Sequence, residues 1–307
     1  MDSIYRQARD VIIWLGTGFS GSDELTSYVN LASSNMSMHM QPELFEYWAK
    51  LVQIPYWTRL WICQEVILAK MITIWIGKSR IVWGQFQHHA DENDLLTSIS
   101  QRAGAERGAG CLRRLVDGRM RQNDEPARGE MSWRAALAVQ KGSACFLQHD
   151  RIFGLLGLVK EELKIDVDYK IPMRTLFYKV LDKHMADDAR HHPWNLAWIP
   201  HLNSLAYFVK DLRYEMGLKK EITDTELATY LRETLQASLH DFSKLAGWRE
   251  VAKYPWKARR VQNWSKTFPN IGYIEGCDWN NYNAQPDDWK AIVPEELHTA
   301  VIEQARQ

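Results

Sequence analysis

The chain of 307 residues has no long apolar run, no paired cysteine motif and no net charge. No run reaches the ~18 apolar residues that a membrane-spanning helix needs, and residues 1–6 lack the apolar core of a secretion signal. The four cysteines lie far apart without a C-x-x-C pair, which favours reduced thiols over a disulfide scaffold or a zinc site. We therefore expect a cytoplasmic protein with no bound metal and no membrane partner.

The composition also argues against nucleic acid as a partner, because 38 basic residues are balanced by 38 acidic ones. Hydrophobic residues make up 46% of the chain and include 14 tryptophans, which is enough for a sizeable core. At ~150 residues per domain, the length indicates two domains. We expect them to comprise residues 1–185 and 186–307. The second is expected to be mainly helical, and its role is unknown.

A β-branched apolar run at residues 11–15 predicts a strand buried on both faces, as in a parallel sheet. It ends in a literal G-x-G-x-x-G over residues 16–21. A dinucleotide site needs a second strand ~20 residues further on, and the sequence of residues 35–42 lacks the β-branched apolar pattern of a strand. The pattern therefore favours a glycine turn over a nucleotide-binding oxidoreductase. Ligands bind at such strand ends, so Gly16 and Gly18 stay candidate ligand contacts.

Residues 55–69 predict a buried helix with Trp57, Trp61 and Glu65 on one face, at positions i, i+4 and i+8. A buried carboxylate beside two indoles is costly unless it is paired, protonated or used in catalysis. Glu65 is therefore either a structural acid, held by Arg59, Arg151 or backbone amides, or a functional one.

The order of predicted elements is strand, helices, strand at residues 71–76, then helix, which indicates an α/β layered core. Residues 99–130 are rich in glycine and arginine and predict a mobile surface insertion. Asp150 is expected to cap an apolar helix, with Arg151 pairing with an acid. In the second domain a capping box at residues 223–226 predicts an amphipathic helix. The basic and aromatic stretch 253–266 is interpreted as packing with a solvated face.

Three stretches, taken in order, resemble motifs of the heterokaryon incompatibility (HET) domain of filamentous fungi. Residues 4–16 are similar to its "IY..A..V..WLG", residues 57–66 to its "W.R.W..QE", and residues 150–158 to its "D.RD..(Y/F).LLGL". Arg59, Gln64, Asp150 and Arg151 are motif positions. The resemblance covers roughly residues 1–185. The family's "SYVWG" and "WIDA.CINQ" segments are missing, so we expect an N-terminally truncated domain.

HET domains are thought to be distant relatives of Toll/interleukin-1 receptor (TIR) domains, so the resemblance implies a flavodoxin-like core with an incomplete parallel sheet. TIR enzymes hydrolyse NAD with a glutamate in a "W-C-x-x-E-L" helix, which residues 61–66 resemble. This implies Glu65 as the catalytic carboxylate, Trp57 and Trp61 as walls around the nicotinamide, and NAD as substrate with no cofactor required. A carboxylate stabilises the positive charge that develops when the nicotinamide–ribose bond breaks.

The resemblance implies a role in fungal self/non-self recognition and programmed cell death, through NAD hydrolysis at Glu65. The alternative is a function without catalysis. An incomplete sheet leaves an edge that can accept a strand from another chain. In this alternative the protein is an interaction module that associates with itself or with other HET or TIR-like proteins.

Overall fold

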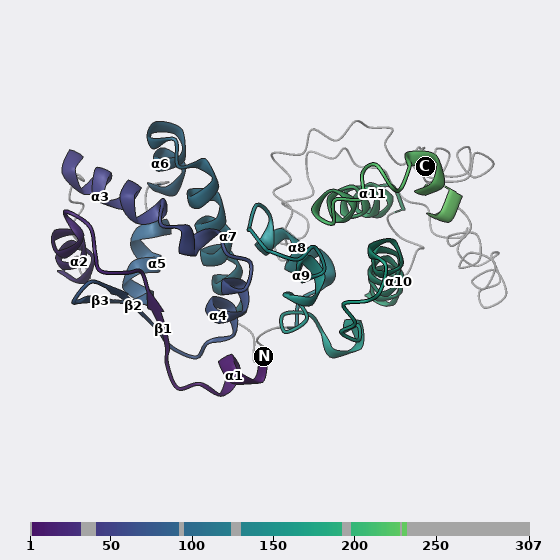
Figure 1. The fold of residues 1–307 in the computed structure, drawn as a ribbon, viewed down its shortest axis with the longest axis horizontal. Coiled ribbons are helices and arrows are strands. Elements are labelled where there is room, and N and C mark those ends of the chain that lie inside the picture. Colours follow the sequence, from purple (N-terminus) through teal and green to yellow (C-terminus); the bar gives the residue numbers. More distant parts are fainter. Residues whose placement is uncertain are drawn as a thin grey trace, which may run out of the picture. The chain divides into compact units, whose positions relative to one another are not determined.

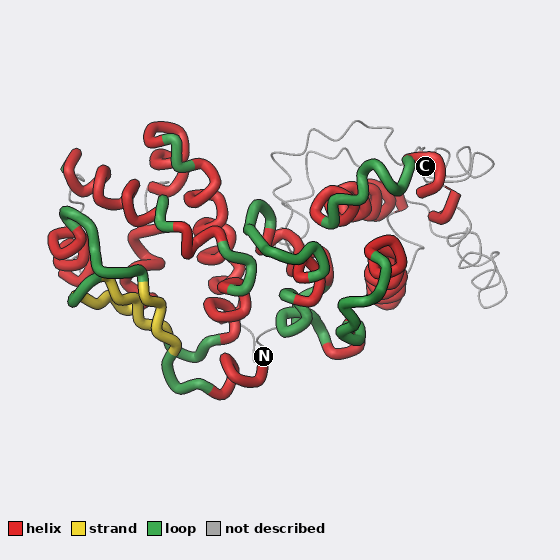
Figure 2. Tube along the Cα trace, in the orientation of Figure 1, coloured by secondary structure: helices red, strands yellow, loops and turns green. Residues whose placement is uncertain are grey.

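The structure is a computed structural model in which the chain forms two compact units, residues 1–169 and 170–307, each described by itself (Figures 1 and 2). The domain boundary expected at residues 185–186 falls inside a helix of the second unit. The described residues are 2–31, 41–91, 95–123, 130–191, 198–227 and 229–231. Most of the window 35–42 and the whole stretch 253–266 lie outside them.

The first unit contains three short strands among helices (Figure 2). Its strands are β1 (Val11–Trp14), β2 (Ile72–Ile76) and β3 (Ser79–Val82). Its longer helices are α2 (Ser22–Leu31), α3 (Pro42–Val52), α5 (Trp83–Asp91), α6 (Leu95–Ala103), α7 (Glu106–Asn123) and α8 (Trp133–Gln140). The shorter ones are α1 (Asp2–Gln7), α4 (Ile62–Leu68) and α9 (Asp150–Phe153), with 3₁₀ turns at Pro55–Thr58 and Glu161–Leu163.

The sheet has the order β1-β2-β3, with β1 parallel and β3 antiparallel to β2. The predicted α/β class is therefore confirmed, but the sheet is mixed rather than purely parallel. The reversal between β2 and β3 occurs at Gly77, whose φ of +59° is favoured by glycine in a tight hairpin. The inner face of the sheet carries Ile13, Ile74 and Ile81, each at most 1% exposed. Helices α2 and α5 pack close to the sheet in Figure 1.

Helix α7 corrects the expected surface insertion. Residues 106–123 form one helix whose apolar stripe is buried against its neighbours, including Ala109, Leu112, Leu115 and Val116. Its glycines permit close approach rather than flexibility. A Cβ at Gly108 would lie 2.2 Å from the carbonyl oxygen of Val52. Residues 124–129 of the expected insertion lie outside the described part.

Arg119 of α7 is also not the solvated arginine that the sequence indicated. It is 5% exposed and donates to the carbonyls of Val66, Ala69 and Lys70, at the end of α4. The last carbonyls of a helix have no partner within the helix. A charged side chain from α7 therefore satisfies them in place of water.

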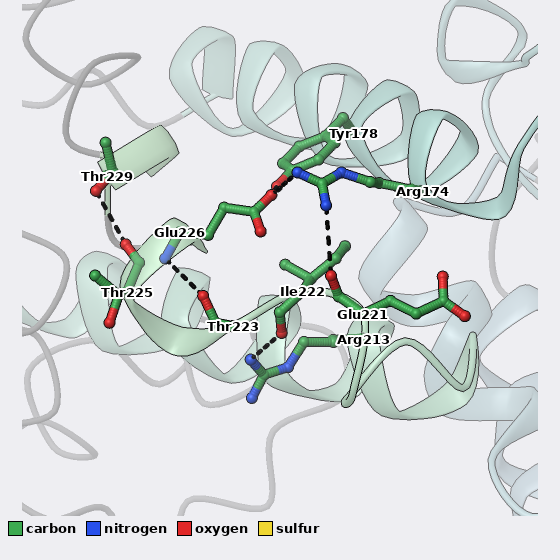
Figure 3. Close-up of polar contacts among 9 residues, drawn as sticks. All are labelled: Arg174, Tyr178, Arg213, Glu221, Ile222, Thr223, Thr225, Glu226 and Thr229. Carbon is green, nitrogen blue, oxygen red and sulfur yellow. Dashed lines mark hydrogen bonds and ion pairs between the residues drawn. The ribbon is translucent and has the colours of Figure 1, made fainter.

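The described part of the second unit is built on α10 (Met173–His191) and α11 (Trp198–Glu215). The predicted capping box begins as expected, since Thr223 accepts from the amide of Glu226 at 3.1 Å. The carboxylate of Glu226 then bonds Arg174 and the hydroxyl of Tyr178 on α10 (Figure 3). The box therefore ties this turn to α10.

Substituting Arg119 with Ala is expected to lower the free energy of unfolding by about 3 kcal/mol, because two buried carbonyls and one partly buried carbonyl lose a charged donor. The measurement is urea unfolding of the full chain. Arg121→Ala is the matched control, since Arg121 lies on the same helix and is exposed. Equal losses in the two variants would contradict a structural role for Arg119.

Candidate functional site

The three motif stretches meet in the first unit, although up to 151 residues separate them. The Gln64 amide of α4 donates to the carbonyl of Gly154 at 2.7 Å. The Arg6 guanidinium of α1 donates to the carbonyl of Gly157 at 3.0 Å. We call this set of contacts, made by residues 5–6, 60–65 and 154–157, the motif junction.

Gly154 fixes how closely these segments approach. A Cβ at this position would lie 2.1 Å from Cδ2 of Leu60 and 2.7 Å from the carbonyl oxygen of Asp150. Leu60 is fully buried and belongs to the second motif. Glycine is therefore required here for space.

Glu65 lies at the edge of the motif junction beside two tyrosines. The Tyr56 hydroxyl donates to Oε2 of Glu65 at 2.6 Å, and Tyr5 of α1 lies close enough for the Glu65 carboxylate to raise its pKa. Burial, together with the adjacent carboxylate, raises the pKa of Tyr56 and that of Tyr5. Both phenols therefore keep their protons and remain donors. We call Tyr5, Tyr56 and Glu65 the Tyr–Glu–Tyr cluster.

Arg59 does not pair with Glu65 in the described part of the chain. Its guanidinium lies 5.5 Å from the ring centre of Tyr56 and is exposed. The Glu65 carboxylate itself is half-buried. The Tyr56 hydroxyl, rather than Arg59, therefore holds the Glu65 carboxylate, and the catalytic role of Glu65 stays a prediction.

The single helix predicted for residues 55–69 is wrong. A 3₁₀ turn ends at Thr58, Arg59 is extended at φ −77° and ψ 137°, and α4 begins only at Ile62. The cause is distant in sequence: the amide of Leu60 donates to the carbonyl of Ala144 at 2.9 Å, and the Ala144 amide donates to Thr58. This short parallel bridge interrupts the helix.

Trp57 therefore does not share a helix face with Glu65. Its side chain is fully buried, its indole N–H donates to the Leu51 carbonyl at 2.9 Å, and its ring stacks on Phe86. Because it is a core residue, the structure does not place it as a wall of a nicotinamide site. Trp61 precedes α4 and is partly exposed.

Gly16 and Gly18 lie at the other end of β1 from the Tyr–Glu–Tyr cluster. Tyr5 precedes the strand and the glycines follow it (Figure 1), so about 13 Å of strand separates them. Both glycines have φ +96°, and a Cβ at Gly18 would lie 3.6 Å from Cα of Gly77. Their turn packs against the β2–β3 hairpin, as the glycine-turn interpretation expected. The predicted ligand residues are not gathered in one site.

Asp150 is not the helix cap that the sequence indicated. His149 occupies the N-cap position without a side-chain hydrogen bond. Asp150 is 7% exposed and accepts from the Tyr169 hydroxyl at 2.7 Å. Burial and this carboxylate raise the pKa of Tyr169 to about 12. Arg151, the next residue, is half-buried.

The side of the sheet opposite its buried isoleucines is a second candidate site, which we call the outer face. Its two rows follow from the strand register, Ile12–Thr73–Val82 and Trp14–Trp75–Arg80. Ile12 is 62% exposed, Trp14 63% and Val82 56%. The prediction that residues 11–15 are buried on both faces is therefore wrong, because no described element covers these side chains.

β1 also forms an open edge of this sheet. The amides of Val11 and Leu15 donate to β2, to the carbonyls of Met71 and Trp75 at 2.9 Å. Alternate residues of a parallel strand bond the same neighbour. The peptide groups of Ile12 and Trp14 therefore point away from β2, toward the open edge.

Comparison with protein-family models, curated proteins and solved structures gave no match. None of the described helices has the length and apolar character needed to cross a bilayer. Function is therefore argued from the two candidate sites. Sequence reasoning missed Tyr5 and Tyr56, although both lie in or beside the motif stretches that indicated Glu65.

Substituting Gly154 with Ala is expected to lower the free energy of unfolding by about 2 kcal/mol, because the added methyl displaces Leu60 or the backbone. Urea unfolding of the full chain measures it. Gly84→Ala is the control, since a Cβ there meets nothing within 4 Å. A Gly154 variant as stable as the Gly84 variant would show that the junction is loosely packed.

The Tyr–Glu–Tyr cluster predicts lower stability in alkaline solution. The ordinary pKa of tyrosine is 10.0 and that of Tyr56 is raised on folding, so above pH 10.0 the unfolded chain loses this proton before the folded one. Unfolding then becomes easier as pH rises, by up to about 1.4 kcal/mol per pH unit for one group. Tyr56→Phe should flatten this dependence, measured by urea unfolding between about pH 9 and 11. An unchanged slope in the variant would contradict the assignment.

Proposed function

We propose that this chain is a HET-type recognition module that acts in the cytoplasm, in fungal self/non-self recognition and cell death, by associating with other proteins. The observation that carries the proposal is the outer face of the sheet, where Ile12, Trp14 and Val82 are each more than half exposed. Purely parallel sheets are normally covered on both faces, and antiparallel ones that face water carry polar residues on that side. An uncovered apolar face of this kind is typical of an interaction surface.

The chemistry of the outer face supports association. Its second row combines two tryptophans with Arg80, and tryptophan and arginine are the residue types most enriched among energetically dominant interface residues. The open edge supports it as well. Isolated edges are usually blunted by lysine, proline or a bulge, and β1 has none of these from Val11 to Trp14.

The motif junction supports the HET-type part of the proposal. Three stretches that were selected only for their resemblance to one domain contact one another through Gln64 and Arg6. The TIR-like part of the proposal is supported by the parallel pairing of β1 with β2, with α2, α3 and α4 between them in sequence. A strand–helix–strand crossover of this kind is the repeating unit of flavodoxin-like cores.

NAD hydrolysis at Glu65 is the second candidate, and one observation favours it. Glu65 is a half-buried carboxylate beside two protonated phenols, so a ribose hydroxyl can replace a tyrosine hydroxyl as its donor. In this reaction water adds to the ribose carbon as the bond to nicotinamide breaks, giving ADP-ribose, nicotinamide and a proton. The carboxylate would stabilise the positive charge on the ribose. Trp57, buried in the core, takes no part.

Two variants separate the candidates in one experiment. The full chain is expressed in a filamentous fungus and cell death is counted, while the purified protein is incubated with NAD and nicotinamide release is followed. We expect Trp14→Glu to reduce cell death at least tenfold, because a charge on the outer face prevents association. We expect the Glu65→Gln variant to cause cell death as the wild-type protein does. We expect no nicotinamide release above background.

Leu31→Glu is the matched control, because Leu31 is 80% exposed at the end of α2. Circular dichroism checks that each variant is folded. Cell death that survives in Trp14→Glu would overturn the proposal. Nicotinamide release by the wild-type protein, lost together with cell death in Glu65→Gln, would establish the second candidate instead.

A further inference from the structure

We infer that the partner of the open edge is a second copy of this chain, with β1 pairing antiparallel to β1 so that Ile12 of each copy lies opposite Trp14 of the other. The inference rests on the proposed function, which makes the sheet the surface of association. It goes further by naming the occupant and the register.

The hydrogen bonds that β1 makes to β2 determine the available register. The ladder runs from Val11 to Leu15, so Ile13 is its centre, and a two-fold axis beside Ile13 places Ile12 opposite Trp14. The peptide groups of these two residues face the open edge. Opposed residues of this kind exchange both of their N–H···O bonds in an antiparallel pair. Pairing about Ile13 therefore satisfies the outward groups of both copies at once.

The side chains favour the same register. Ile12 and Trp14 both lie on the outer face, and an aromatic residue beside a β-branched one is a favourable cross-strand pair. In a register shifted so that Ile12 lies opposite Ile12 of the second copy, Trp14 would lie opposite Asp10. The Asp10 carboxylate accepts from Thr73 on the same face. The indole would then be packed against a charge.

Charge also selects a second copy over a charged partner. No residue from Val11 to Leu15 is charged, and the whole chain has a net charge of +0. Two identical edges therefore meet without repulsion, and a net charge near zero promotes self-association. An acidic or basic segment would find no counter-charge along this edge.

The opposite edge of the sheet shows what a protected edge looks like in the same protein. β3 carries the charged Arg80 on the outer face, and the Arg80 carbonyl accepts from the side chain of Asn30 on α2 at 2.9 Å. Charged side chains and covering elements are the usual protection of an edge. β3 has both, and β1 has neither in the described part of the chain, so only β1 is left to pair.

The size of the contact predicts a weak dimer. Trp14 is 63% exposed, which corresponds to roughly 150 Å² of accessible surface. A short strand pair with two such side chains buries less than the roughly 1,000 Å² at which stable interfaces begin. We therefore expect dimers that form and dissociate with concentration in the micromolar range.

The register is tested with single cysteines introduced into the full chain, with Cys145 and Cys277 changed to Ser. Ile12→Cys and Trp14→Cys proteins are mixed and mildly oxidised. Opposed residues have Cα atoms about 5.5 Å apart, which a disulfide can bridge. In a dimer of either variant alone, the Cα atoms of the two equivalent cysteines lie about 9 Å apart, which is too far for a disulfide. We expect at least tenfold more linked dimer in the mixture than in either variant by itself, and equal yields would overturn the register.

The backbone contact is tested by sedimentation of the full chain over a concentration series. Ile12→Pro removes an N–H that faces the open edge and leaves the ladder to β2 intact, since proline is tolerated where the N–H faces outward. Ile12→Val keeps that N–H and is the control. We expect the dissociation constant to rise at least tenfold in the proline variant only. A wild-type protein that stays monomeric at all concentrations would overturn the inference.

The two proposals can fail separately. If the protein is monomeric while Trp14→Glu still abolishes cell death, self-pairing is wrong, and association with a different protein stands. If the Ile12–Trp14 disulfide forms while Trp14→Glu leaves cell death unchanged, self-pairing is established and the proposed function is wrong.

Discussion

The buried hydrogen bond from Gln64 to the carbonyl of Gly154 holds together two parts of the first unit that lie 90 residues apart in sequence. Gln64 is 2% exposed and lies in α4, a helix of only seven residues. A helix this short is not stable by itself in water. The next residue of α4, Glu65, accepts from Tyr56 of the preceding turn. The last carbonyls of α4 are held by Arg119 of α7. Helix α4 therefore depends on partners outside the helix, which are Gly154, Tyr56 and Arg119.

This arrangement explains which parts of the fold were predictable. The strand at residues 72–76 was predicted within one residue, because a β-branched run bounded by glycine is a local signal. The break at Arg59 was not, because it depends on Ala144. The glycines of α7 indicated a loop, since nothing local shows that a Cβ at Gly108 would lie 2.2 Å from the carbonyl oxygen of Val52. The predicted burial of Ile12 and Trp14 was wrong for a related reason, because the sequence of an apolar strand does not show whether another element covers it.

The candidate sites show the same division. The motif resemblance identified Glu65 but not its partners, because the tyrosines come from a separate helix and a separate turn. The resulting cluster differs from the predicted pocket in a way that matters chemically. The Glu65 carboxylate already accepts from the Tyr56 hydroxyl, and any ligand has to compete with that donor. On the outer face no comparable competition exists, because the indole of Trp14 and the side chain of Ile12 are covered by no described element. This difference is why association is favoured over hydrolysis.

The pairing of Val11 with Ile72 has a further consequence during protein synthesis. A ribosome that adds about 5–20 residues per second needs several seconds to make the chain between these two strands. Throughout that time β1 is present as an apolar strand without β2, so both of its edges and both of its faces are open. Pairing over such a long loop is also slow to form. The segment that carries Ile12 and Trp14 therefore stays exposed until β2 has been made, and a chaperone that binds apolar strands would protect it during that time.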